Sequence, residues 1–433
     1  MIKRVDIEPT EEELIELIKH DLVGRNEDIT DLIFIIDSID GGYSIFVDGT
    51  WGCGKTFFIK QTELVLRTLN KKIDDRKVDN LTEINAFKNF SISKSYLPFY
   101  YNAWMYDSNL DPLITLVGNL ASGSIKWKDK IGAKKWEIVR TLVDSIFDMI
   151  GLRFSLKNIK DAMNDHTLDS LTEEMEIRKK FEKLIDLLLG DNDKLILFID
   201  ELDRCSPAFA MKLLERVKFI FGYEKVILIF STNAYQLANM VKKMYGNDTD
   251  GHSYLTRFYD MKLPLRPIDM KQYLSAIRGL GPSATWFSAA VAEAASTLNM
   301  RECNRYIQEL EAHYDVASEY KGTTSSSGFG RYNEYIIVEC VIFPILLSLK
   351  TKSETIYFEI IRGEGKDHFL NLMKHSAILK TCIQNYESRS TIKIDLEELY
   401  DACFAKKMDY GTFESWELEF NRITARFKSK HKL

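Results

Sequence analysis

Eight consecutive residues near the start of the chain have the types and spacing of a phosphate-binding loop. They are Gly49, Thr50, Trp51, Gly52, Cys53, Gly54, Lys55 and Thr56, which read G-x-x-x-x-G-K-T directly after the apolar run 44–48. Glycines allow backbone N–H groups to curve around phosphate oxygens, Lys55 supplies a positive charge, and the Thr56 hydroxyl can ligate Mg²⁺. Because a helix is expected from Phe57 onward, its positive N-terminal end would face the anion. The segment predicts nucleoside triphosphate binding; a glycine turn that only links strand to helix is the alternative.

A second apolar run ends in two adjacent acids. The run 194–199 reads K-L-I-L-F-I, is continuously apolar after Lys194, and is followed by Asp200 and Glu201. A central parallel strand that is covered on both faces has this composition and delivers polar side chains at its carboxyl end. We expect Asp200 to hold the shell of a Mg²⁺ ion and Glu201 to orient and deprotonate an attacking water. The alternative is a pair of acids that caps a strand at the surface.

Two further polar residues are candidates for the same site. Asn233 follows the apolar run 226–230 and is expected to sense the γ-phosphate or to hold the water, although asparagine is also a common turn residue. Arg204 could stabilise developing charge, in cis or across a subunit interface. A structural pairing of Asp203 with Arg204 is the other interpretation, since arginine often braces neighbouring elements.

These motifs resemble the KAP family of P-loop NTPases, within the additional-strand, catalytic-glutamate class. The resemblance is carried by the segments 49–52 (G-T-W-G), 99–104 (F-Y-Y-N-A-W), 200–205 (D-E-L-D-R-C), and 254–258 (Y-L-T-R-F) with Leu263-Pro264. It extends over roughly residues 20–310 and implies Mg²⁺-dependent ATP hydrolysis. Related bacterial proteins without membrane helices imply a role in antiphage defence.

Two arginines are added to the site by weaker parts of this resemblance. The segment 22–27 is similar to one that leads toward the adenine in related ATPases, which makes Arg25 a nucleotide-binding candidate. The segment 298–305 is similar to a lid helix with a sensor arginine, which makes Arg301 the candidate. Each could instead be an ordinary arginine on a helix surface.

Two departures from the family are visible. Relatives commonly carry Asp where Asn233 stands, which brings the turnover rate into question but not nucleotide binding. Many relatives have membrane-spanning helices between the loop and the acids, whereas residues 113–189 here are charged and amphipathic, without an apolar run of sufficient length. A membrane-span-free relative is therefore expected, with peripheral membrane contact as the remaining alternative.

Composition limits the classes of partner. The chain has 433 residues, a formal net charge of −6 and a sequence pI near 5.8, so no global basic field indicates nucleic acid. The basic tail 422–432 is interpreted as a solvated terminus or as a nucleic-acid-binding arm. The first residues lack an apolar signal core, and six scattered cysteines form no zinc or disulfide pattern, so a cytoplasmic location is expected.

The order of the apolar runs predicts the fold. Strands expected near 44–48, 98–102, 194–199, 226–231 and 260–265 alternate with helical stretches, which indicates a parallel, doubly wound α/β sheet of the P-loop NTPase type. We expect a core over 1–268 with a large helical insertion at about 105–193, a helical lid over 269–322 and a mostly α-helical C-terminal module over 323–433. The Gly-Thr-Ser segment 322–328 is the expected flexible connection. The apolar run 335–349 is expected to be a buried helix.

The expected function is an ATPase whose hydrolysis opens and closes the lid. This motion would act on a protein partner, such as a toxic effector in antiphage defence. The protein is expected to form a homo-oligomer with ATP at the subunit junctions. The alternative is a weakly hydrolysing ATP-binding scaffold for a partner or a membrane-associated complex. A nucleic-acid motor is a third candidate, against which the acidic chain and the missing helicase motifs argue. ATP is favoured over GTP because no N-K-x-D segment follows the fourth strand.

Overall fold

The computed structural model describes residues 10–70, 72, 78, 81–108, 110–125, 133–160, 167–218, 222–270, 272–274, 285–314, 336–390 and 393–405. Its contacts divide the chain into two compact units. The N-terminal unit comprises Pro9–Asp21 and Arg25–Arg266, and the C-terminal unit is built mainly from Pro267–Leu433. The expected boundary after residue 268 lies two residues from this division. The finer split into a lid and a module remains a prediction.

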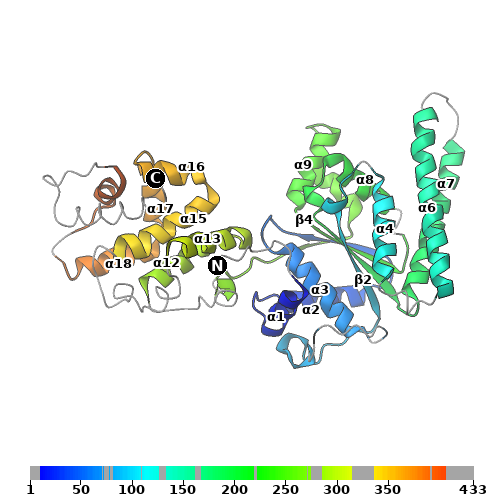
Figure 1. The fold of residues 1–433 in the computed structure, drawn as a ribbon, viewed down its shortest axis with the longest axis horizontal. Coiled ribbons are helices and arrows are strands. Elements are labelled where there is room, and N and C mark those ends of the chain that lie inside the picture. The colour runs from blue at the N-terminus through cyan, green and yellow to red at the C-terminus, as the bar shows by residue number, and fades with distance from the viewer. Residues whose placement is uncertain are drawn as a thin grey trace. The chain divides into compact units, whose positions relative to one another are not determined.

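A five-stranded parallel sheet forms the centre of the N-terminal unit (Figure 1). The strands are β1 (Tyr43–Asp48), β2 (Tyr96–Asn102), β3 (Lys194–Asp200), β4 (Val226–Thr232) and β5 (Met261–Pro264). Their spatial order is β2-β3-β4-β1-β5, so β4 lies between the strand that precedes the glycine-rich loop and the strand that ends in the acids. The predicted parallel α/β fold is confirmed.

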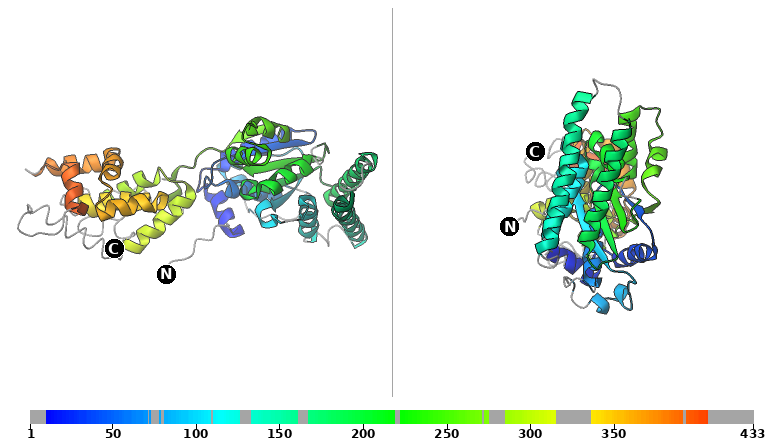
Figure 2. Two further views of the ribbon diagram at one scale, coloured as in Figure 1. Left: turned by 90° about the horizontal axis from the view of Figure 1, so that it is seen from above. Right: turned by 90° about the vertical axis from the view of Figure 1, so that its right-hand side faces the viewer.

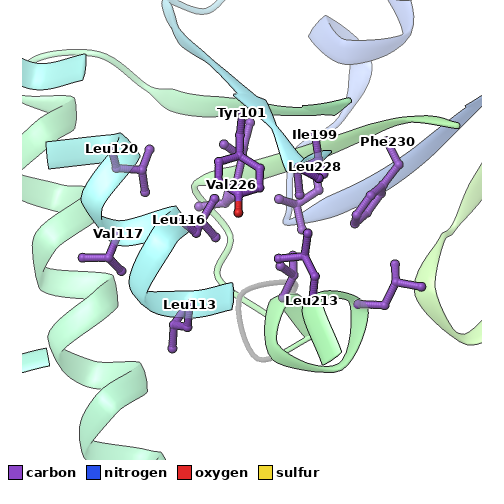
Figure 3. Close-up of a cluster of buried hydrophobic side chains, with 14 of the residues drawn as sticks. Tyr101, Leu113, Leu116, Val117, Leu120, Ile199, Leu213, Val226, Leu228 and Phe230 are labelled. Atoms are coloured by element: carbon purple, nitrogen blue, oxygen red, sulfur yellow. The ribbon is translucent and has the colours of Figure 1, made fainter. Parts of the chain in front are cut away.

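Helices cover both faces of this sheet, which is why β3 and β4 are buried along their whole length. The helices are α1 (Glu11–His20), α2 (Asn26–Ser38), α3 (Lys55–Leu69), α4 (Pro112–Ile125), α8 (Pro207–Lys218), α9 (Ala234–Tyr245) and α10 (Gly251–Leu255). Figure 1 shows α1, α2 and α3 on one face and α4, α8 and α9 on the other. Figure 3 shows Tyr101 of β2 and Leu228 of β4 packed with Leu116 of α4 and Leu213 of α8 in the buried core.

The predicted helical insertion contains α4, α6 (Ala133–Lys160) and α7 (Thr167–Leu189). Helices α6 and α7 lie side by side at one edge of the unit, next to α4 (Figure 2). Val139, Val143, Ile146 and Ile150 recur at helical spacing along α6 and are buried in the common core. Among the described residues, no helix combines the length and the apolar character needed to cross a membrane.

The C-terminal unit is helical in its described parts. Its elements are α12 (Trp286–Ala295), α13 (Met300–His313), a π-helix (Ile336–Ile342), α15 (Phe343–Lys352), α16 (Glu354–Arg362), α17 (Lys366–Lys374), α18 (Ala377–Glu387), α19 (Leu396–Tyr400) and a second π-helix (Asp401–Ala405). The apolar run expected as a buried helix is the first π-helix continued by α15, and Pro344 stands in the first turn of α15. The expected connection at 322–328 and the basic tail at 422–432 lie outside the described residues.

Candidate nucleotide-binding and hydrolysis site

The glycine-rich loop connects β1 to α3 at the carboxyl edge of the sheet. Gly52 has φ 83° and Gly54 has φ 91°, in the left-handed region where a side chain would be strained. Gly54 is the residue before α3, so the chain turns directly from the loop into the helix and presents the first N–H groups of that helix at the loop. The loop backbone therefore has the shape that its sequence predicts.

Lys55 lies over this loop as a buried cation. Lys55 is only 8% exposed, and its Nζ donates to the carbonyls of Gly49 at 2.7 Å and Thr50 at 3.2 Å. Among the described residues, no carboxylate forms an ion pair with Lys55. A buried ammonium without a negative partner is electrostatically incomplete. This observation fits the binding of an anionic phosphate by the loop.

Asp200 ends β3 and is held on both sides. The residue is 1% exposed, its Oδ1 accepts the N–H of Glu201 at 2.9 Å and its Oδ2 accepts the hydroxyl of Tyr100 at 3.0 Å. Each carboxylate oxygen retains a further lone pair. The Asp200 carboxylate and the Thr56 hydroxyl are oxygen ligands of the kind that Mg²⁺ prefers, so the residues present fit the ion.

Glu201 contacts the loop helix across the site. The Thr56 Oγ1 donates to Glu201 Oε1 at 3.4 Å, which shows that the segments following β1 and β3 meet although β4 separates the two strands. Glu201 itself has φ 62°, a left-handed conformation that costs a non-glycine residue about 1 kcal/mol. Such strain is typical of functional positions that the surrounding structure holds in place.

The environment of Glu201 favours the protonated carboxyl. Burial, followed by the charge of Asp200, raises its pKa to about 7, while Arg204 acts in the opposite direction. A carboxyl group with a pKa near neutrality can accept a proton and release it again at cellular pH. Glu201 thus has the electrostatic setting of a general base.

Arg204 pairs with Glu201 and not with Asp203. Its Nε lies 2.5 Å from Glu201 Oε2, and its guanidinium stands over the ring of the exposed Trp104 at 5.6 Å from the centroid. Asp203 is buried and accepts the indole N–H of Trp51 at 2.5 Å. The sequence-based alternative, a structural pair between Asp203 and Arg204, is therefore wrong. Arg204 pairs with Glu201 instead, because the left-handed backbone at Glu201 brings these two side chains together.

The comparison with known families agrees with this geometry. The family model for the KAP family P-loop domain matches residues 25–317, which is more than half of the chain. The chain belongs to the KAP family of P-loop NTPases. No curated protein matches it. Membership of this family supports nucleotide binding, and the loop, the acidic strand and the intervening β4 form the candidate site for it.

Asn233 of this KAP NTPase follows β4 and caps the next helix. Its side-chain oxygen accepts the N–H of Gln236 at 3.2 Å, so Asn233 is the N-cap of α9. This is a structural role of the kind that the turn interpretation expects. Among the described residues, its amide nitrogen has no hydrogen-bond partner, and the residue is buried. The amide nitrogen thus remains the group through which Asn233 would meet a phosphate or a water.

The two arginines that the resemblance suggested lie in different units. Arg25 is 2% exposed in the N-terminal unit; it donates to the carbonyls of Arg266 at 2.5 Å and Cys53 at 3.4 Å and pairs with Asp28. It is therefore a buried brace of the loop and not an ordinary surface arginine. Arg301 lies on α13 of the C-terminal unit, and its sensor role remains a prediction.

One residue of the site escaped sequence reasoning. Tyr100 lies on β2, one strand away from Asp200, and its hydroxyl donates to that carboxylate. It stands within a segment, 99–104, that the family resemblance already marks. Its role could not be read from that segment, because the sequence does not show which strand neighbours the acidic one.

Proposed function

We propose that this protein is a Mg²⁺-dependent ATPase that acts as a nucleotide-driven conformational switch. The observation that carries the proposal is the meeting of Thr56 and Glu201 beside a buried Lys55 that forms no ion pair with a carboxylate among the described residues. This contact supports a site in which the loop would bind the anion, Thr56 and Asp200 would bind the metal and Glu201 would act as the base.

Each side chain has a distinct task in this reaction. Lys55 and the loop N–H groups bind the phosphates, and Thr56 and Asp200 would hold Mg²⁺, which neutralises charge on the transferred phosphoryl group. Glu201 orients the attacking water and takes its proton on the carboxylate. Asn233 would position the water or the γ-phosphate through its amide nitrogen. The ion pair with Arg204 favours the carboxylate form, in which Glu201 can accept that proton.

Two substitutions separate binding from hydrolysis. Lys55→Ala should abolish nucleotide binding, whereas Glu201→Gln should retain ATP and stop turnover; Lys243→Ala, on the exposed side of α9, is the matched control. Calorimetry measures binding with Mg²⁺-ATP and Mg²⁺-GTP, and phosphate release measures turnover. Phosphate release by the Glu201→Gln protein at the wild-type rate would refute the assignment of the base.

The cellular part of the proposal is antiphage defence together with a protein effector, as a cytoplasmic homo-oligomer. It is motivated by the membership of the KAP family of P-loop NTPases. Cells that express the protein with its genomic neighbours should survive phage better than cells with the Lys55→Ala variant. Equal survival would exclude this role, and co-purification with each neighbour identifies the effector.

A weakly hydrolysing scaffold is the second candidate. Two observations favour it: Arg204 holds the candidate base in an ion pair, and the oxygen of Asn233 is committed to capping α9. Turnover measured alone and with DNA, RNA or co-purifying partners distinguishes the two functions. Stimulation by any of these components would reject the passive scaffold.

A further inference from the structure

Tyr100 is placed to orient the carboxylate that the proposed function assigns to Mg²⁺. Its hydroxyl donates to Asp200 Oδ2 at 3.0 Å, while the Glu201 N–H occupies Oδ1 at 2.9 Å. Two donors on two different oxygens fix the rotation of a carboxylate and thereby the directions of its remaining lone pairs. Glu201 contributes a backbone group, so among the described residues Tyr100 is the side chain on which this orientation depends.

The register of the sheet explains why Tyr100 reaches this carboxylate. On the neighbouring strand, Asn102 stands opposite Asp200 and Tyr100 stands opposite Phe198, two residues earlier. Residues two apart on a strand share a face, and a tyrosine is long enough to span the distance to the diagonal neighbour. The hydroxyl thus arrives at Asp200 from the face that α3 covers.

The ring of Tyr100 is itself held by the helix that carries the loop threonine. Lys60 Nζ lies 4.9 Å from the centroid of this ring. Lys60 is one helical turn beyond Thr56 in α3, so both side chains lie on the same side of that helix. The side chain that contacts Asp200 is therefore packed against the same helix that carries the proposed metal ligand Thr56.

We propose that Tyr100 is a positioning residue for Mg²⁺: through Asp200 it sets how tightly the nucleotide complex holds the metal. This inference rests on the proposed function. Hydrogen-bond partners of metal ligands fix the ligand's orientation, and their loss typically weakens metal binding by about 10- to 100-fold. A tyrosine that only filled space between β2 and α3 would not have this effect.

The test is a pair of hydroxyl deletions on adjacent residues. Tyr100→Phe removes the contact with Asp200, whereas Tyr101→Phe removes a hydroxyl that pairs with Thr115 at 2.8 Å on the opposite face of the same strand (Figure 3). Binding of Mn²⁺ to each protein with a non-hydrolysable ATP analogue is measured by electron paramagnetic resonance. Nucleotide affinity without metal is measured by calorimetry.

Tyr100→Phe should weaken Mn²⁺ binding about tenfold and leave metal-free nucleotide affinity unchanged, while Tyr101→Phe should change neither. In an Asp200→Asn background, Tyr100→Phe should add no further loss, because the hydroxyl acts through the carboxylate. Unchanged Mn²⁺ affinity in Tyr100→Phe would overturn the inference. Normal metal binding by a wild-type protein that hydrolyses nothing would instead remove the ATPase proposal and leave this one standing.

Discussion

The ion pair between Arg204 and Glu201 makes a prediction about the pH dependence of turnover. Burial and the charge of Asp200 raise the pKa of Glu201 to about 7, and of the two positive groups that oppose this rise, Arg204 and Lys55, Arg204 has the larger effect. Arg204→Gln removes that charge and preserves a polar side chain. An opposite charge at contact distance shifts a carboxyl pKa by about 1–3 units, and we take about 1 unit because the two side chains remain 24% and 15% exposed.

The size of the effect follows from the ionised fraction of Glu201. Only the carboxylate can accept a proton, so kcat/KM should rise with pH through the pKa of the free protein. With a pKa near 7, about half of the wild-type molecules carry the base at pH 7, and with a pKa near 8 about one in ten does. Arg204→Gln should therefore lose about fivefold in kcat/KM at pH 7 and recover by pH 9.

The assay is phosphate release from Mg²⁺-ATP between pH 6 and pH 9, with Arg178→Gln as the control. Arg178 forms a comparable pair with Glu182 at 2.9 Å on α7, so its replacement costs an ion pair without touching Glu201. The midpoint of the kcat/KM profile should move to higher pH for Arg204→Gln alone. A profile with the wild-type midpoint would refute the electrostatic coupling, whatever its absolute rate.

Two further predictions concern stability and the loop. Since the folded pKa of Glu201 lies above its ordinary value of 4.5, its contribution to stability is complete below pH 4.5 and is lost as pH rises through about 7. Glu201→Gln should therefore be more stable than wild type by roughly 3 kcal/mol at pH 8 and equally stable near pH 4 in urea unfolding. An equal gain at both pH values would contradict this. A Cβ on Gly49 would lie 2.6 Å from Cys53 Sγ, so Gly49→Ala should weaken calorimetric nucleotide binding about tenfold through overpacking. Adding Cys53→Ala should restore most of the affinity, and a double variant as weak as Gly49→Ala would exclude that contact as the cause.

Local patterns predicted the strands and the loop of this protein well. The expected strand at 194–199 is observed as Lys194–Asp200, and the one at 226–231 as Val226–Thr232. Continuous apolar runs of this length are stable only when both faces are covered, so the sequence itself indicates central parallel strands. Gly52 and Gly54 likewise adopt positive φ angles that the loop conformation requires, and this requirement is local to the loop.

The partners of the polar side chains were decided by tertiary structure. Arg204 could pair with any acid nearby, and the left-handed backbone at Glu201 selects that residue while Trp51 and Thr232 bind Asp203. Tyr100 reaches Asp200 only because β2 lies beside β3 in one particular register. A sequence states which groups can donate or accept, but a hydrogen bond needs two groups within about 3 Å, and strand order and register bring them there.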